Sequence, residues 1–186
     1  MGVGTFGTVV RGNRDGIEVV GKTIHRMERQ RTEIQAGVMT EVYALERCAG
    51  IATITQLWDL VLVDARFVLI FEPWGKHLGV YFQEFPGDRR PDYLRKILGD
   101  VVAGIGYLHS PLRLLHADLK SNNVLVRAAS APGGLPAARV ADLGSVLQAA
   151  LPPFPPQRKP ARPSAPSSPG GVVWKRRANQ SYAFLC

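Results

Sequence analysis

The sequence is poor in cysteine and contains no long hydrophobic run. Its two cysteines, Cys48 and Cys186, cannot build the disulfide framework that holds small secreted domains together. No apolar stretch reaches the roughly 18 residues that a membrane span needs. The N-terminus also lacks the basic and apolar regions of a signal peptide. We therefore expect an intracellular, reducing location, cytoplasmic or nuclear, and no membrane partner.

Acidic residues are absent from residues 151–186. This tail carries +6 of the net charge of +8, which leaves +2 for residues 1–150. Nucleic-acid binding is therefore not expected, because it would depend on the short basic cluster at 175–177. Eight prolines fall between residues 152 and 169, so we expect the tail to be extended or disordered.

The tail also contains "PFPPQR", which has the P-x-x-P-x-basic form of a polyproline ligand. An SH3-like domain is the partner that this form fits. In so proline-rich a segment, however, a chance match is the simpler explanation.

The first part of the chain has the pattern of a β-rich unit with one helix. The helix is indicated by Val38, Val42 and Leu45, which recur with the spacing of one helix face, and it ends at Gly50. Glycine-rich turns and β-branched runs mark the strands. The predicted elements are a glycine-rich turn running into a strand at 2–12, further strands at 17–24, 57–63 and 66–71, and a helix at 29–50.

A second helix is predicted at residues 91–110. Pro91 suits a first helical turn. A wide apolar face follows it, made of Leu94, Ile97, Leu98, Val101, Val102, Ile105 and Leu108. Beyond a small-residue loop at 128–137, "ARVADLGSV" has the form of a short strand and a turn.

Polar residues are concentrated in "HADLKSNNVLV". Asp118, Lys120 and Asn123 lie within six residues of one another, directly before a short apolar strand. Such a cluster is typical of a binding or catalytic loop at the end of a sheet. With Asp142, these residues offer oxygen ligands that suit Mg²⁺, a carboxylate that can accept a proton, and an ammonium group for a phosphoryl group.

A glycine-rich turn precedes a strand near the N-terminus. Gly2, Gly4 and Gly7 are followed by a strand rather than a helix, which disfavours a dinucleotide-binding fold. A turn of this kind can place backbone N–H groups over phosphates, although an ordinary hairpin has the same pattern. Lys22 follows on the next strand and would need a carboxylate partner there. Spacing alone leaves Glu33, Glu41 and Glu46 as candidates.

Over residues 2–146 the sequence resembles the eukaryotic protein kinases, of the serine/threonine type. Five motifs follow one another in the family's order: "GVGTFGTV", "VVGK", "EVYAL", "HADLKSNN" and "DLG". The resemblance implies an α+β, bilobal kinase-like fold with an antiparallel β N-lobe, one key helix and the start of a helical C-lobe. The implied domains are the N-lobe and hinge at 1–75, a partial C-lobe at 76–150 and the tail at 151–186.

The same resemblance implies a role for each motif. Lys22 would bind the α- and β-phosphates of ATP, with Glu41 as its helix partner. Asp118 would be the catalytic base and Lys120 would contact the transferring phosphoryl group. Mg²⁺ would be bound by Asn123 and Asp142. The residues implied to surround ATP are Gly2, Val3, Gly4, Gly7, Val9, Val20, Lys22, Phe71, Glu72, Trp74 and Leu125.

Three features depart from the family pattern. Ala117 replaces the usual Arg of the catalytic loop, so we expect no switching by an activation-loop phosphate. After "DLGS" the sequence has no Ala-Pro-Glu motif, and the first strand is missing. We therefore expect an incomplete catalytic domain with little or no activity of its own, from a kinase that phosphorylates Ser or Thr in proteins. The alternative is a nucleotide-binding pseudokinase or an interaction protein that uses its proline-rich tail.

Overall fold

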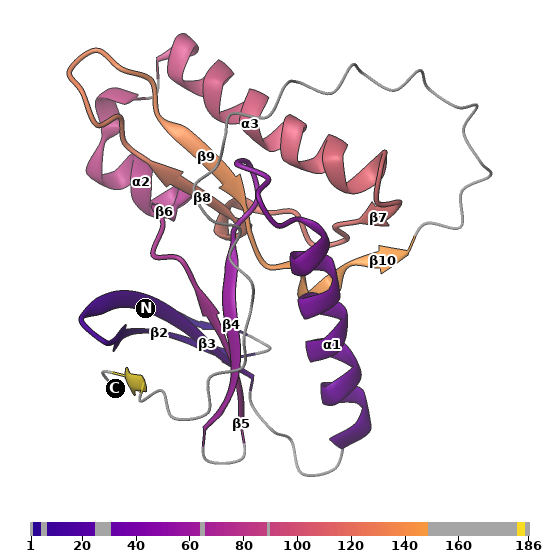
Figure 1. The fold of residues 1–186 in the computed structure, drawn as a ribbon. Helices are drawn as coiled ribbons and strands as arrows, with labels where there is room; N and C mark the ends of the chain where they lie inside the picture. Colours follow the sequence, from indigo (N-terminus) through magenta and orange to yellow (C-terminus); the bar gives the residue numbers. More distant parts are fainter. Residues whose placement is uncertain are drawn as a thin grey trace, which may run out of the picture.

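The computed structural model describes residues 2–4, 7–24, 31–63, 66–88, 90–148 and 182–184. Within these ranges the protein forms two lobes, one built on a larger sheet and one in which helices pack against a small sheet (Figure 1). This is the α+β, bilobal arrangement that the sequence predicted. The disorder predicted for the proline-rich segment at 152–169 concerns residues outside the described ones.

The first lobe is an antiparallel sheet in the order β1-β2-β3-β5-β4. The turn between β2 and β3 is Asp15-Gly16, and both residues have positive φ, as this class of tight hairpin requires. Near the end of the chain, β11 pairs with Gly12–Arg14 of β2, where the sequence predicted no element. The strands are β1 (Gly2–Gly4), β2 (Gly7–Arg14), β3 (Ile17–Ile24), β4 (Leu57–Val63), β5 (Arg66–Phe71) and β11 (Tyr182–Phe184).

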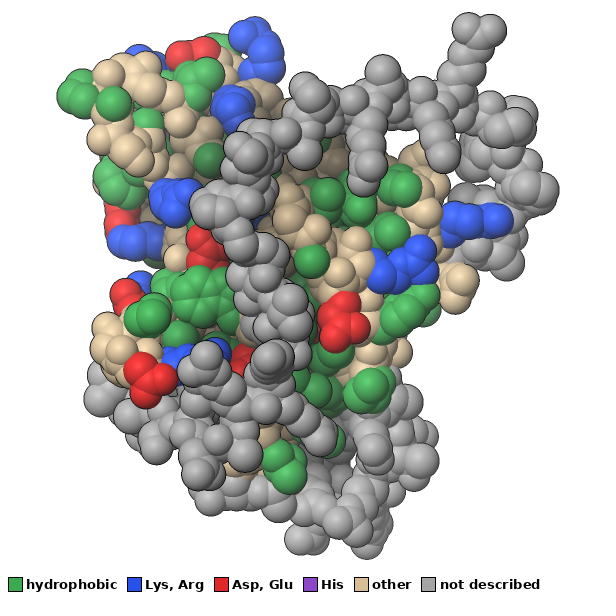
Figure 2. Space-filling model, viewed as in Figure 1, with side chains coloured by type: hydrophobic (Ala, Val, Ile, Leu, Met, Phe, Trp, Pro, Cys, Tyr) green, Lys and Arg blue, Asp and Glu red, His purple; other side chains and the backbone are tan. Residues whose placement is uncertain are grey.

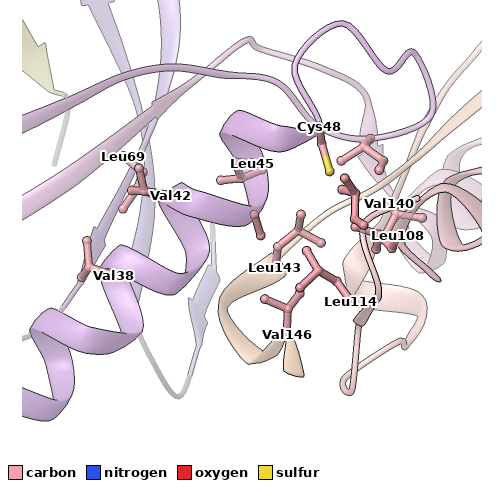
Figure 3. Close-up of a cluster of buried hydrophobic side chains, with 13 residues drawn as sticks. Val38, Val42, Leu45, Cys48, Leu69, Leu108, Leu114, Val140, Leu143 and Val146 are labelled. Carbon is pink, nitrogen blue, oxygen red and sulfur yellow. The ribbon is translucent and has the colours of Figure 1, made fainter. Parts of the chain in front are cut away.

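Helix α1 (Arg31–Arg47) lies beside this sheet (Figure 1). Its apolar residues Val38, Val42 and Leu45 are buried, in the periodicity that the sequence showed. They belong to a core cluster that also contains Leu69 of β5 and Leu143 from the second lobe (Figure 3). The main core therefore joins the two lobes through α1.

The second lobe packs α3 against a three-stranded sheet in the order β6-β8-β9. Helix α3 begins at Pro91 and buries Ile97 and Leu108. The elements are β6 (Lys76–His77), α2 (Leu78–Glu84), α3 (Pro91–His109), β7 (Leu114–Leu115), β8 (Val124–Arg127), β9 (Ala137–Val140) and β10 (Leu147–Gln148), with short 3-10 turns η1 (Pro86–Asp88), η2 (Ser121–Asn123) and η3 (Leu143–Ser145).

Two sequence expectations for this lobe need correction. Helix α2 was not predicted, because it is short and follows directly on Pro73 and Gly75, residues that typically interrupt regular structure. The apolar face of α3 was predicted too wide, since Leu98 and Val102 are 61% and 69% exposed. Periodicity identified the helix but could not show how much of its apolar face finds a neighbour.

The described surface is mixed in charge. On the face shown in Figure 2, Lys and Arg side chains are interspersed with Asp and Glu side chains, and the described residues form no basic patch there. Among the described residues, no helix is long and apolar enough to cross a lipid bilayer.

Candidate active site

Lys22 is held between two carboxylates from different elements. Its Nζ lies 2.8 and 2.9 Å from the two carboxylate oxygens of Glu41 on α1. It also lies 2.6 Å from Oδ1 of Asp142, which follows β9. Among the carboxylates that spacing left open, Glu41 therefore contacts Lys22, whereas Glu46 is exposed. The side chain of Glu33 lies outside the described ones.

Strand pairing explains why Lys22 faces α1. Lys22 lies opposite Val9 on β2 and Leu69 on β5. Residues directly opposite in an antiparallel sheet share a face, and Leu69 is part of the core under α1. Glu41 lies three residues after the buried Val38 and four before the buried Leu45, so the register of α1 places it on the same face of the helix.

Burial and charge act against each other in this cluster. Glu41 is only 2% exposed, and burial is the largest influence on its carboxyl, raising the pKa above the usual value against the opposing charge of Lys22. For Lys22, burial lowers the pKa, but the attraction of Glu41 and Asp142 outweighs it and leaves the pKa raised. The ammonium group therefore stays charged at neutral pH.

A second polar cluster lies in the loop before β8. Lys120 Nζ donates to Asp118 Oδ2 at 2.7 Å. Asn123 Nδ2 donates to the backbone oxygen of Asp118 at 2.8 Å and to its Oδ2 at 3.2 Å. The hydrogen bond from Lys120 is the largest of the effects that lower the pKa of Asp118. Asp118 is therefore an ionised carboxylate that can accept a proton.

Hydrogen bonds tie the two clusters together. The ring Nε2 of buried His116 lies 3.0 Å from the backbone oxygen of Ala141, and the Ala141 N–H donates to the backbone oxygen of Asn123 at 2.9 Å. Ala141 directly precedes Asp142, so the loop that carries Asp118 and the loop that carries Asp142 (the two carboxylate loops) are joined at Ala141.

The turn at Asp142 is anchored by the residue after it. Asp142 has φ +60° and ψ +71°, a left-handed conformation that costs energy in a residue other than glycine. Leu143 is fully buried beside Leu45 and Val146 in the core that crosses between the lobes (Figure 3). Apolar burial of Leu143 thus offsets the strain and directs Asp142 toward Lys22.

The glycine-rich turn lies at the tip of the β1–β2 hairpin, where Gly4 is paired with Gly7. Lys22 and Val9 are paired on the neighbouring strands, and Val20 is paired with Phe71 at the end of β5. Val9, Val20 and Lys22 therefore lie on one face of the sheet, next to the tip of the hairpin.

A comparison with known protein families matches residues 1–154 of the 186-residue chain to the protein kinase domain. The match includes both carboxylate loops, the paired lysine and the glycine-rich hairpin. The chain belongs to the protein kinase family.

The resemblance to kinases implies that the segment after β5 is the hinge between the lobes. Here it begins at Glu72, whose N–H donates to the backbone oxygen of Gln56 at 3.3 Å. Trp74 is buried at 7% exposure, and Leu125 on β8 is half-buried opposite His77 and Arg139. Glu72, Trp74 and Leu125 thus lie at the junction between the sheet and the second lobe.

The oxygen donors fit a magnesium ion better than a transition metal. Within the described ranges, no three His, Cys, Asp or Glu side chains form a ready-made metal site. Magnesium needs fewer protein ligands, because it keeps waters and binds substrate phosphates. Asn123 uses its amide nitrogen toward Asp118, which leaves its amide oxygen for a cation. The carboxylate of Asp142 is 38% exposed and therefore accessible to a hydrated ion.

One residue of this kinase site was not singled out from the sequence. Arg139 on β9 forms an ion pair with Glu72, with Nη1 2.6 Å from Oε2. The available signal was a charged residue within the otherwise apolar "ARVA", three residues before Asp142. Its partner could not be inferred, since the two residues are 67 positions apart.

Proposed function

We propose that this protein is an ATP-dependent protein kinase that transfers a phosphoryl group from Mg-ATP to Ser or Thr hydroxyls of protein substrates. The observation that carries the proposal is the contact of Lys22 with both Glu41 and Asp142. This contact brings together a strand, a helix and a loop that the family uses to bind nucleotide phosphates and metal.

The residues divide into a nucleotide side and an acceptor side. On the nucleotide side, Lys22 would neutralise phosphate charge, with Glu41 holding its ammonium group in position. On the acceptor side, Asp118 would orient the substrate hydroxyl and accept its proton. Lys120, whose Nζ lies 2.7 Å from Oδ2 of Asp118, would stabilise charge on the transferring group. The hydrogen bonds through Ala141 keep the two sides in register.

The metal would be held by Asn123 and Asp142, and Mg²⁺ would supply charge neutralisation at the β- and γ-phosphates. In the structure, Asp142 is already linked to Lys22 at 2.6 Å. The proposed phosphate-binding ammonium group of Lys22 and the proposed metal-binding carboxylate of Asp142 are therefore neighbours.

The preference for Ser and Thr rests on Lys120, which stands where the serine/threonine branch of the family has a lysine. The proposed domain division is an N-lobe with its hinge at 1–75, a partial C-lobe at 76–150 and a tail at 151–186. Because residues 146–186 contain no Ala-Pro-Glu motif, we expect this chain by itself to bind Mg-ATP but to transfer phosphate slowly. Transfer needs alignment that helices beyond this motif brace, and a misplacement of about 1 Å can cost on the order of a hundredfold.

Two measurements test the proposal. Calorimetric titration with Mg-ATP should give binding that Lys22→Met weakens. Transfer of radiolabelled phosphate to a generic protein substrate, measured with a complete helical lobe fused after residue 148, should depend on Asp118. Loss of transfer in Asp118→Asn, with nucleotide binding retained, is the expected result. Binding without Asp118-dependent transfer in the fused protein would favour the nucleotide-binding pseudokinase instead.

A further inference from the structure

Arg139 connects three segments that are far apart in the sequence. Its Nη1 pairs with Oε2 of Glu72 in the hinge at 2.6 Å. Its Nε donates to the backbone oxygen of Ala52, between α1 and β4, at 3.0 Å. The Arg139 side chain is only 12% exposed and that of Glu72 is 28% exposed, so the ion pair is partly shielded from water, whereas the hydrogen bond to Ala52 lies at the surface. Two directed contacts from one planar guanidinium group fix the positions of both partners, which an ammonium group could not do equally well.

The same guanidinium group also packs on the hinge tryptophan. The Cζ of Arg139 lies 4.5 Å from the centre of the Trp74 ring, and the Cζ of Arg127 lies 4.8 Å from it. Cations at these distances are attracted to an indole face. Trp74 is 7% exposed, and its indole nitrogen has no hydrogen-bond partner among the described residues. The two arginines, rather than a hydrogen bond, therefore hold this side chain.

Backbone packing reinforces this attachment of the hinge. Gly75 has φ +58°, and a Cβ there would lie 2.6 Å from the backbone oxygen of Val126 on β8. The chain after Trp74 therefore approaches β8 more closely than any other residue would allow. The hinge is fastened to the β8–β9 pair at Glu72, Trp74 and Gly75.

Strand β9 leads from this attachment to the metal-binding loop. The Val140 N–H donates to the backbone oxygen of Thr53 at 2.8 Å, and its carbonyl accepts from the Thr55 N–H at 3.0 Å. Asp142 follows two residues later and contacts Lys22. Arg139 thus belongs to a short rigid element with the hinge at one end and the phosphate-side carboxylate at the other.

We propose that Arg139 is a positioning residue for the adenine end of the nucleotide. Through Glu72, Trp74 and the Ala52 carbonyl, it holds the hinge backbone in the conformation that receives the base. This inference rests on the proposed nucleotide-binding function. It predicts that Arg139 matters for a ligand with a base and not for the phosphate chain alone.

The test compares magnesium complexes of ATP and of inorganic tripolyphosphate, which lacks the base. Arg139→Ala should weaken ATP binding about tenfold, equivalent to about 1.4 kcal/mol, and leave tripolyphosphate affinity unchanged. Arg139→Lys should recover only part of the loss, because lysine keeps the positive charge but lacks the planar set of N–H donors that contacts Glu72 and Ala52 together. Arg11→Ala is the matched control, since Arg11 forms an exposed pair with Glu18 and should change neither affinity.

The remaining variants separate the possible failures. Lys22→Met should weaken both ligands, and if it weakens neither, the proposed nucleotide site itself is wrong. If Lys22→Met behaves as expected while Arg139→Ala leaves ATP binding unchanged or weakens both ligands equally, the positioning role is overturned. Should Arg139→Ala not fold, Glu72→Gln keeps the shape of the pair and removes its charge. Glu72→Gln must then show the same selective loss of ATP affinity. If ATP affinity is unchanged in that variant, the positioning role of Arg139 is overturned.

Discussion

Replacing Lys22 by Met would leave a buried carboxylate without its counter-ion. Glu41 is 2% exposed, and both of its carboxylate oxygens accept a hydrogen bond from Lys22. Breaking a buried pair by removing one partner typically costs about 3–5 kcal/mol, because the remaining charge stays desolvated. We expect a loss of that size in the free energy of unfolding at pH 7.5, measured by urea denaturation.

The loss should depend on pH in a defined direction. Burial raises the pKa of Glu41, and Lys22 opposes that effect. In Lys22→Met the opposition is gone, so the folded-state pKa rises further above the unfolded value. A group with a raised pKa in the folded state stabilises the fold below its unfolded pKa, and this contribution is lost as the pH rises through the folded pKa. The penalty of the variant should therefore shrink as the pH falls toward 5.

Two further variants decide whether the unpaired charge is the cause. Lys22→Met combined with Glu41→Gln removes both charges, while Asp142 remains partly exposed to water, so much of the stability should return. Lys76→Met breaks a pair with Glu84 in which both side chains are more than 40% exposed, and it should cost at most about 1 kcal/mol. A double variant no more stable than Lys22→Met, or a penalty that does not change with pH, would refute the reasoning.

Two other predictions concern the supports of the site. Leu143→Ala should lower the free energy of unfolding by about 2–5 kcal/mol in the same urea titration, because Leu143 is fully buried. The control Leu147→Ala, at a 58% exposed position, should change it by less than about 1 kcal/mol. Equal effects would contradict the assignment of Leu143 to the core. Gly75→Ala should lower the melting temperature more than Gly16→Ala. Both glycines have positive φ, but of the two only Gly75 would place a Cβ 2.6 Å from the backbone oxygen of Val126. The reverse order would count against the close approach of Gly75 to β8.

Local patterns predicted most of the first lobe. The strands at 57–63 and 66–71 have the predicted boundaries, and α1 buries the residues that its periodicity marked. Both signals are short-range, because alternation and helix spacing depend on neighbours a few residues away. Helix α2 was missed because its seven residues are too few for a clear helical period.

Contacts between remote segments were predictable only where the sequence marked both partners. Asp118, Lys120 and Asn123 lie within six residues, so their clustering followed from the sequence itself. The ion pair of Arg139 with Glu72 spans 67 positions, and although Arg139 is the one charged residue in "ARVA", nothing near either residue indicates that the two are partners. Such a pair depends on the relative placement of two lobes, which no local pattern contains.

The placement of the two lobes depends on an apolar contact between them. The charged groups of the site come from both lobes, and exposed or partly exposed charges alone align surfaces weakly. Leu143 packs against Leu45 on α1, while its neighbour Asp142 contacts Lys22. Moving α1 away from the second lobe would therefore expose apolar surface and separate the charged groups at the same time. We infer that the geometry of the phosphate-binding groups is set by this core, so changes at α1 should alter nucleotide binding even where they touch no polar residue of the site.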